Sequence, residues 1–221
     1  MECLLVASLP IQQMEKLDLV KKYKPYYTAN VKPEEVFFEE AKFLSITGQG
    51  DPSEMEFTRN IQALYTVAYA VKFIFKARGN DFVVPKLEGL WWFDEKKYKG
   101  ISMYETPVLV ARKEWMYKLL LRIPELVKPS DILKAIGAVV AKKKLDLANS
   151  VQPYQLNEGR CVQILHVGPF DKEIETLRKL DQFMSKGNLK KNGLHHEIYL
   201  SDFRRTPPEK LRTILREPVK G

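Results

Sequence analysis

The chain has 221 residues, of which 45% are hydrophobic and 29% are charged, a composition typical of one large globular domain or two small ones that excludes collagen, coiled coil and a disordered chain. Lysine and arginine number 36 against 28 acidic residues, so the net charge is +8. The basic residues lie in short clusters beside acids, which favours a solvated surface over a nucleic-acid partner. Direct DNA binding, with a steep salt dependence, is the weaker alternative.

Two cysteines, Cys3 and Cys161, have no histidine or cysteine partner at the spacing of metal ligands. We therefore predict no disulfide framework, no metal site and a reducing compartment. The N-terminus, MECLLVASLPIQQMEK, has a short apolar stretch and no basic leader, which is too little for a signal peptide or a membrane span. We predict a cytoplasmic protein with no membrane partner and no cofactor.

The first half of the chain predicts a strand–helix–strand–strand unit over residues 41–124. Residues 42–47 alternate as a strand does, and strand-like runs cover 83–93 and 114–123. Residues 1–40 mix Lys, Tyr and Pro and predict an N-terminal arm packed over the core. The long helix has its apolar residues at the i, i+3, i+4 spacing of one buried face: Phe57, Ile61, Leu64, Tyr65, Ala68, Val71 and Phe75.

The second half repeats this order over residues 156–221. A strand at 160–168 is followed by a helix with one apolar stripe and by strands at 195–202 and 211–219. The sequence therefore predicts an α+β fold built from tandem strand–helix–strand–strand repeats.

A helix connects the two units within residues 125–155. It starts near Pro129 and ends at three lysines, which suit a helix C-terminus. Aligning the units puts Gly50 on Gly168 and Glu88 on Glu197, which supports a duplication.

The segments LEGLWW, QILHVGPFD and HHEIYLSDFRRTPPEKLRTILREPV, in this duplicated order, resemble the GyrI-like small-molecule-binding family. That family also provides the effector-binding domain of multidrug-responsive transcription activators, and LEGLWW is similar to a stand-alone branch without a DNA-binding module. The resemblance runs from about residue 18 to the C-terminus. It implies one domain over residues 1–221, in which the two units are related by pseudo-twofold symmetry and form a concave ligand cleft.

The resemblance also implies a function, which is the binding of hydrophobic, aromatic, drug-like molecules around a central acid that falls on Glu197. Some stand-alone relatives resemble hydrolases that detoxify cyclopropanoid genotoxins by opening the cyclopropane ring. The other interpretations are a non-catalytic multidrug-binding or sensing protein and a gyrase-interacting protein. Gyrase and a second copy of the chain are thus the candidate macromolecular partners.

Glu197 and Tyr199 are the candidate catalytic residues. They lie two apart in a strand and so share one face, whereas the apolar neighbours Ile198 and Leu200 point to the opposite face. A carboxylate in aromatic surroundings can attract a cation or act as a general base toward water, and a phenol can polarise a ligand carbonyl. A solvent-facing Glu197 on an edge strand is the alternative.

Glu88, Trp91 and Trp92 are candidate ligand contacts in the corresponding strand. Glu88 and Trp92 share one face, which favours Trp92 as the cleft residue and Trp91 as a core residue, although a bulge at Gly89 would bring both into the cleft. An indole beside a carboxylate suits a flat or cationic ligand. Two core aromatics are the alternative.

Two further candidate ligand contacts are Tyr117 and His166. Tyr117 lies on the aromatic-rich face of its strand, and His166 ends a strand just before a Gly-Pro turn. A lone histidine there is more often a hydrogen-bond partner of the turn than a catalyst. His195 and His196 face opposite ways in a strand, which argues against a metal held by the pair.

Overall fold

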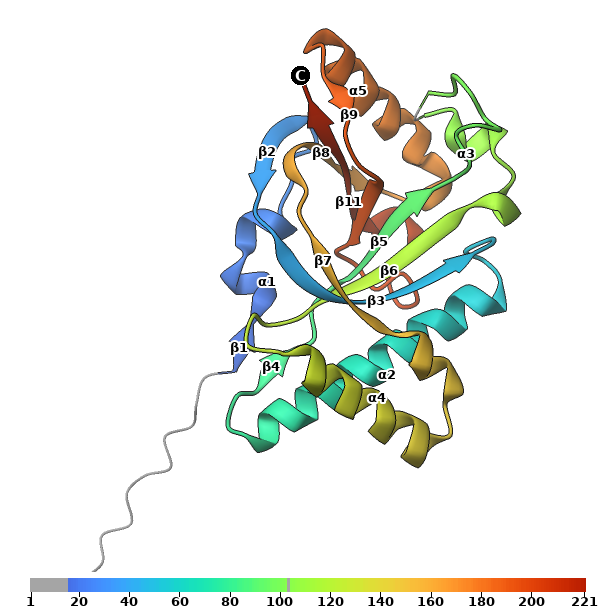
Figure 1. Cartoon of the computed structure of the whole chain (residues 1–221). Helices are drawn as coiled ribbons and strands as arrows, with labels where there is room; N and C mark the ends of the chain where they lie inside the picture. Colours follow the sequence, from blue (N-terminus) through green and yellow to red (C-terminus); the bar gives the residue numbers. More distant parts are fainter. Residues whose placement is uncertain (1–15, 103) are drawn as a thin grey trace, which may run out of the picture.

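The computed structural model describes residues 16–102 and 104–221 (Figure 1). Cys3 and the rest of the segment 1–15 lie outside the described residues. The helices are α1 (Leu19–Lys22), α2 (Met55–Ala77), α3 (Thr106–Leu109), α4 (Pro129–Lys143) and α5 (Glu173–Lys186), with 3-10 turns η1 (Lys24–Tyr27), η2 (Arg112–Glu114), η3 (Asp146–Ser150), η4 (Phe170–Lys172) and η5 (Pro208–Lys210). The strands are β1 (Leu17–Asp18), β2 (Glu34–Phe38), β3 (Ala41–Gln49), β4 (Phe82–Val83), β5 (Leu87–Trp92), β6 (Met116–Arg122), β7 (Gln152–Leu156), β8 (Gly159–Val167), β9 (Lys190–Lys191), β10 (His195–Tyr199) and β11 (Arg212–Lys220).

The two predicted units are present. The first is β3–α2–β5–β6 and the second is β8–α5–β10–β11. The large sheet has the order β2-β8-β11-β10-β5-β6-β3-β7, so β5 and β10 meet at its centre and the strands outward from them correspond pair by pair. This symmetric order confirms the α+β fold with pseudo-twofold tandem repeats.

The glycines that align the two units occupy the same position in each. Gly50 and Gly168 end β3 and β8 with φ values of 125° and 134°, which favour glycine. Their amides donate to the carbonyls of Trp115, at 2.9 Å, and of Leu211, at 3.0 Å, just before β6 and β11. The predicted equivalence of these glycines is correct.

The predicted equivalence of Glu88 and Glu197 is wrong by one residue. Tyr117 of β6 is paired with Trp91 of β5, and the corresponding Thr213 of β11 is paired with Tyr199 of β10. Trp91 is therefore the counterpart of Tyr199. Two residues earlier in each strand, Gly89 is the counterpart of Glu197. A slip of one residue in a strand moves a side chain to the other face of the sheet.

The strands that flank the two units cross over between them. β2 pairs antiparallel with β8, from Glu34↔Gln163 to Phe38↔Gly159. β7 pairs antiparallel with β3, from Ala41↔Leu156 to Ser45↔Gln152. Each unit thus borrows its outer strand from the segment that precedes the other unit, and the sheet curls, as the crossing ribbons of β2, β3, β7 and β8 show (Figure 1).

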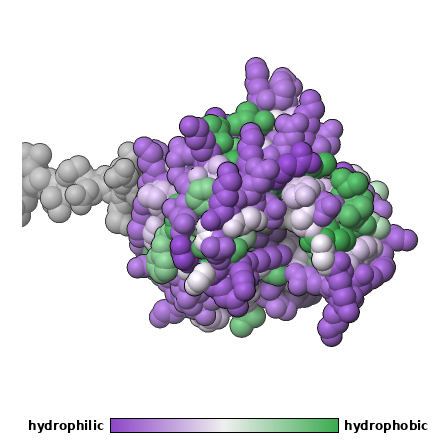
Figure 2. Space-filling view, turned by 90° about the horizontal axis from the view of Figure 1, so that it is seen from above, coloured by the Kyte–Doolittle hydropathy of each residue, from purple (hydrophilic) through white to green (hydrophobic). Residues whose placement is uncertain are grey.

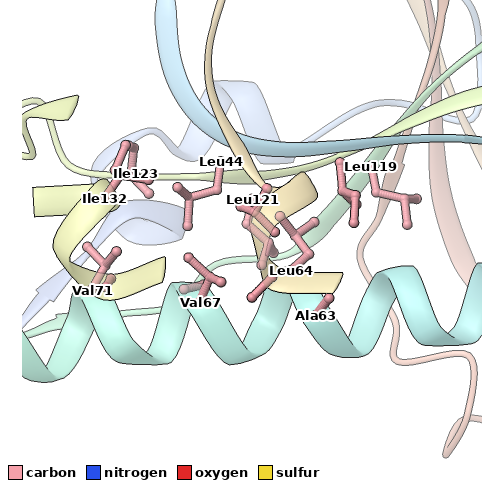
Figure 3. Close-up of a cluster of buried hydrophobic side chains, with 14 of the residues drawn as sticks. Leu44, Ala63, Leu64, Val67, Val71, Leu119, Leu121, Ile123 and Ile132 are labelled. Carbon is pink, nitrogen blue, oxygen red and sulfur yellow. The ribbon is translucent and has the colours of Figure 1, made fainter. Parts of the chain in front are cut away.

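The three long helices, α2, α4 and α5, cover one face of the sheet. α2 and α4 lie together against the first unit (Figure 1), and α5 packs on β8 and β11 of the second. Under α2 the side chains of alternate strand residues meet one stripe of the helix (Figure 3), namely Leu44, Leu119, Leu121 and Ile123 against Ala63, Leu64, Val67 and Val71, with Ile132 of α4. Burial of these apolar groups, at roughly 25 cal/mol per Å², holds the layer together.

The opposite face of the central strands encloses a buried ionic network. Arg216 is fully buried and donates to Glu158 at 2.9 Å and to the Tyr26 carbonyl at 2.8 Å. His196 lies 2.8 Å from Glu158 through Nδ1 and 3.1 Å from Glu88 through Nε2. Although burial raises the pKa of Glu158, His196 and Arg216 lower it to about 2. Two carboxylates, an arginine and a histidine thus satisfy one another where water cannot reach them.

Figure 2 shows the molecule from above, relative to the view in Figure 1. The surface on this side is mostly hydrophilic, and its hydrophobic residues form separate patches. Among the residues that the structure describes, no helix combines the length and the apolar character that crossing a membrane requires.

Candidate functional site

A cavity of about 870 Å³ lies on the helix-covered face, above the two central strands. β5 and β10 form its floor, the first turn of α2 and the side of α5 form two walls, and residues of the loop between β5 and β6 close it. Its aromatic lining is formed by Phe57, Trp91, Trp92, Phe93, Tyr98, Trp115, Phe170, Tyr199 and Phe203. All three tryptophans of the chain therefore face one cavity.

Glu197 and Tyr199 both line this cavity, whereas Ile198 between them is fully buried on the other face. The side chain of Glu197 is 15% exposed. Burial, and next the nearby Glu197 carboxylate, raise the pKa of Tyr199 well above its usual value, so the phenol keeps its proton. A carboxylate and a phenol donor thus stand side by side.

Trp91 and Trp92 line the cavity together, so the assignment of Trp91 to the core and Trp92 alone to the cleft is wrong. The Trp91 indole donates to the Tyr199 hydroxyl at 3.1 Å and stacks on Phe57 with the ring centres 5.8 Å apart. The Tyr199 hydroxyl oxygen is thus an acceptor for Trp91, while its proton interacts with the neighbouring Glu197 carboxylate. Gly89 makes room for the hydrogen-bonded Trp91 and Tyr199 side chains, because a Cβ at this position would lie 2.9 Å from the indole nitrogen of Trp91.

Glu88, Tyr117 and His166 do not line the cavity. Glu88 is fully buried on the opposite face, where Tyr26 donates to it at 2.6 Å, and this excludes it from the cleft as a direct ligand contact. The Tyr117 hydroxyl accepts a hydrogen bond from Asn60 at 2.9 Å behind the aromatic wall. His166 is buried, with Nε2 3.2 Å from the carbonyl of Pro169, as expected of a histidine that holds a turn.

The cavity contains acidic groups that the sequence did not single out. Glu173 and Glu217 line it with Glu197, and Glu217 pairs with Nδ1 of His195, whose Nε2 lies 3.5 Å from Glu197. The period-two spacing from Glu197 could have identified His195. Glu217 and Glu173 had no such signal, because they come from another strand and from a helix whose apolar stripe does not include Glu173.

His195 is a cation at neutral pH. Although burial lowers the pKa of His195, Glu217 and Glu197 raise it to about 10. The imidazolium therefore neutralises only one of the two adjacent carboxylates. The site keeps negative charge in apolar surroundings, which favours a cationic or electron-poor ligand.

This pairing predicts that the protein loses stability in alkaline solution. The unfolded chain releases the His195 proton near pH 6.5 and the folded chain only near pH 10. The folded state binds more protons between these values, so the free energy of unfolding should fall with rising pH by up to about 1.4 kcal/mol per unit. Urea unfolding at pH 7 and pH 9 measures this loss. His195→Gln should flatten the dependence and His166→Gln should not, and equal slopes in wild type and His195→Gln would contradict the prediction.

A model described as the GyrI-like small molecule binding domain matches residues 32–220. The chain belongs to the GyrI-like family. This GyrI-like protein is similar to an uncharacterized conserved protein from Listeria innocua, with 38% identity, a TM-score of 0.82, and coverage of 93% of this chain and 100% of that one. It is also similar to the crystal structure of a hydrolase from Listeria innocua, with 37% identity, a TM-score of 0.78 and the same coverage.

Its likeness to the C-terminal domain of EcmrR is one of fold alone. The identity is 11% and the TM-score 0.54, and the match covers 86% of this chain and 97% of that one. A comparison with curated protein sequences gives no match. The match of the family model over residues 32–220 confirms the predicted family, and the cavity belongs to a GyrI-like small-molecule-binding domain.

Proposed function

We propose that this GyrI-like domain binds flat, hydrophobic aromatic molecules in the cavity over β5 and β10, with Glu197 as the polar anchor. The observation that carries the proposal is a carboxylate at the floor of a cavity of about 870 Å³ whose walls are aromatic. Aromatic rings contribute large apolar contact and stack on planar ligands, and a few polar groups in such a pocket set the orientation of the ligand.

A titration with proflavine, a planar aromatic cation, tests binding. Because Trp91, Trp92 and Trp115 all line the cavity, occupancy should quench most of the tryptophan fluorescence in a saturable manner. Glu197→Gln should weaken binding of the cation, whereas Glu209→Gln, at an exposed position, should leave it unchanged. Absence of saturable quenching in the wild type would rule the proposal out.

Hydrolysis of a cyclopropanoid genotoxin is the second candidate function. It is supported by the adjacency of Glu197 and Tyr199 and by the likeness to the Listeria innocua hydrolase. Water activated by Glu197 would attack the ring carbon while Tyr199 polarises the carbonyl that receives the electrons. Release of ring strain and gain of aromaticity would supply most of the driving force.

Single-turnover incubation with a cyclopropanoid DNA alkylator, followed by absorbance and mass, separates the two candidates. Ring-opened product carrying one added water supports hydrolysis. Quenching without product supports a sequestering or sensing domain. Interaction with gyrase and self-association remain predictions that pull-down with gyrase and light scattering would test.

A further inference from the structure

Among the buried carboxylates that line the cavity, Glu173 is the one for which the described residues provide neither a hydrogen bond nor an ion pair to the side chain. It is the first residue of α5, in the cavity wall, and is 8% exposed. Its Oε1 is shielded from solvent and has no partner. Native proteins leave few buried polar atoms without a partner, and each such atom calls for an explanation, because a buried polar atom without a partner destabilises the fold.

The surroundings of Glu173 disfavour its ionised form. Burial, and next the Glu197 carboxylate on β10, raise the pKa of Glu173 well above its usual value. The other groups that face it from β10 are Tyr199 and His195, and the charge of His195 is already shared with Glu217 of β11. A neutral carboxyl group differs from its ionised neighbours in one respect, which is that it can donate a hydrogen bond.

We propose that Glu173 is a second polar contact of the cavity, which donates a hydrogen bond to a carbonyl oxygen of the bound aromatic molecule. The inference rests on the proposed function, since it assumes that the aromatic cavity binds a ligand. It also narrows the class of ligand, because aromatic ketones and related carbonyl compounds would be preferred over hydrocarbons of the same shape. Unionised Glu173 accordingly serves selectivity, while Glu197 supplies the negative charge.

In a cyclopropanoid substrate the same contact would complete the proton balance. Glu197 takes a proton from water as the water oxygen bonds to the ring carbon. The cyclopropane C–C bond breaks, and its electron pair moves through the dienone to the carbonyl oxygen. Glu173 gives its proton to that oxygen, which becomes a phenol. A proton passed back from Glu197 by way of solvent restores Glu173, so that the sum is substrate plus one water.

A matched pair of planar probes, 9-fluorenone and fluorene, tests the inference, because they differ in one carbonyl group. Tryptophan quenching should show that the wild type binds fluorenone about fivefold more tightly than fluorene, as expected of one net hydrogen bond. Glu173→Gln, which keeps a donor, should retain the preference. Glu173→Leu should lose it while still binding fluorene, and Glu175→Gln, an exposed neighbour on α5, should behave as the wild type does.

The thermal stability of Glu173→Leu distinguishes a ligand contact from a structural role. If Glu173 stabilised the fold, its replacement would lower the melting temperature. Glu173→Leu removes a partnerless buried carboxyl, so its melting temperature should rise by about 2–4 °C. Three outcomes would overturn the inference: equal affinity of the wild type for the two probes, a preference for fluorenone that persists in Glu173→Leu, or a preference that is lost in Glu173→Gln. As long as fluorene binds, none of these outcomes contradicts the proposed function. Failure of both probes to bind overturns the proposed function and the inference with it.

Discussion

Arg216→Met should lower the free energy of unfolding by about 3–5 kcal/mol. The guanidinium has no exposed surface and donates to Glu158, to the Gln163 side chain and to the Tyr26 carbonyl. It also stacks on Phe38, 4.0 Å from the ring centre. Methionine would fill part of the space, but it would leave three acceptors without this donor in a region that water does not reach. Urea unfolding followed by circular dichroism measures the difference.

Arg160→Met is the matched control for this change. Arg160 lies on β8 and pairs with Glu35 at 2.7 Å, but its side chain is 48% exposed, so the same substitution should cost about 0–1 kcal/mol. The contrast isolates the effect of burial from the loss of a charge. Similar losses in the two variants would refute the idea that the enclosed network determines the stability of the sheet.

Glu197→Gln should slow ring opening of a cyclopropanoid compound by about 10²–10⁴-fold, as expected on loss of a general base. Glutamine has the same shape and cannot take a proton from water. Tyr199→Phe removes one of the two proposed donors to the carbonyl oxygen, the other being Glu173, and should cost about 10²–10³-fold. Single-turnover rates, with product mass as the second readout, measure both effects.

Two controls make this experiment specific. Fluorene binding by tryptophan quenching should be unchanged in Glu197→Gln, which separates loss of turnover from loss of the cavity. Glu88→Gln keeps the charge and shape of the cavity lining, since Glu88 lies on the opposite face, and should retain the wild-type rate if the variant folds. Equal turnover by wild type and Glu197→Gln would remove Glu197 from the mechanism.

Much of the site could be predicted because strand geometry is local. Side chains two apart in a strand share a face, so the spacing of Glu197 and Tyr199, with Ile198 between them, sufficed to group the two polar residues on one side. The apolar stripe of α2 identified the helix and its buried side in the same manner. The motifs that resemble the GyrI-like family then indicated that a ligand cleft lies on that side.

Glu88 shows where local reasoning stops. Its strand alternates as β10 does, and sequence alignment placed it on Glu197, but the strand pairings make Glu88 the counterpart of His196 instead. The face to which Glu88 points is covered by Tyr26 and Tyr27, from a segment about 60 residues earlier in the chain. No local pattern contains that contact.

Local sequence patterns were enough to predict the two strand–helix–strand–strand units, the buried faces of their helices and the shared face of Glu197 and Tyr199. Local patterns did not predict that Trp91 and Trp92 both reach the cavity or that Glu173 joins it from α5; these positions follow from the packing of the elements. The physical reason is that periodicity within an element is set by backbone geometry, whereas register and docking are set by contacts between residues far apart in the chain. The acidity of the cavity arises from such contacts, since Glu173, Glu197 and Glu217 come from three different elements.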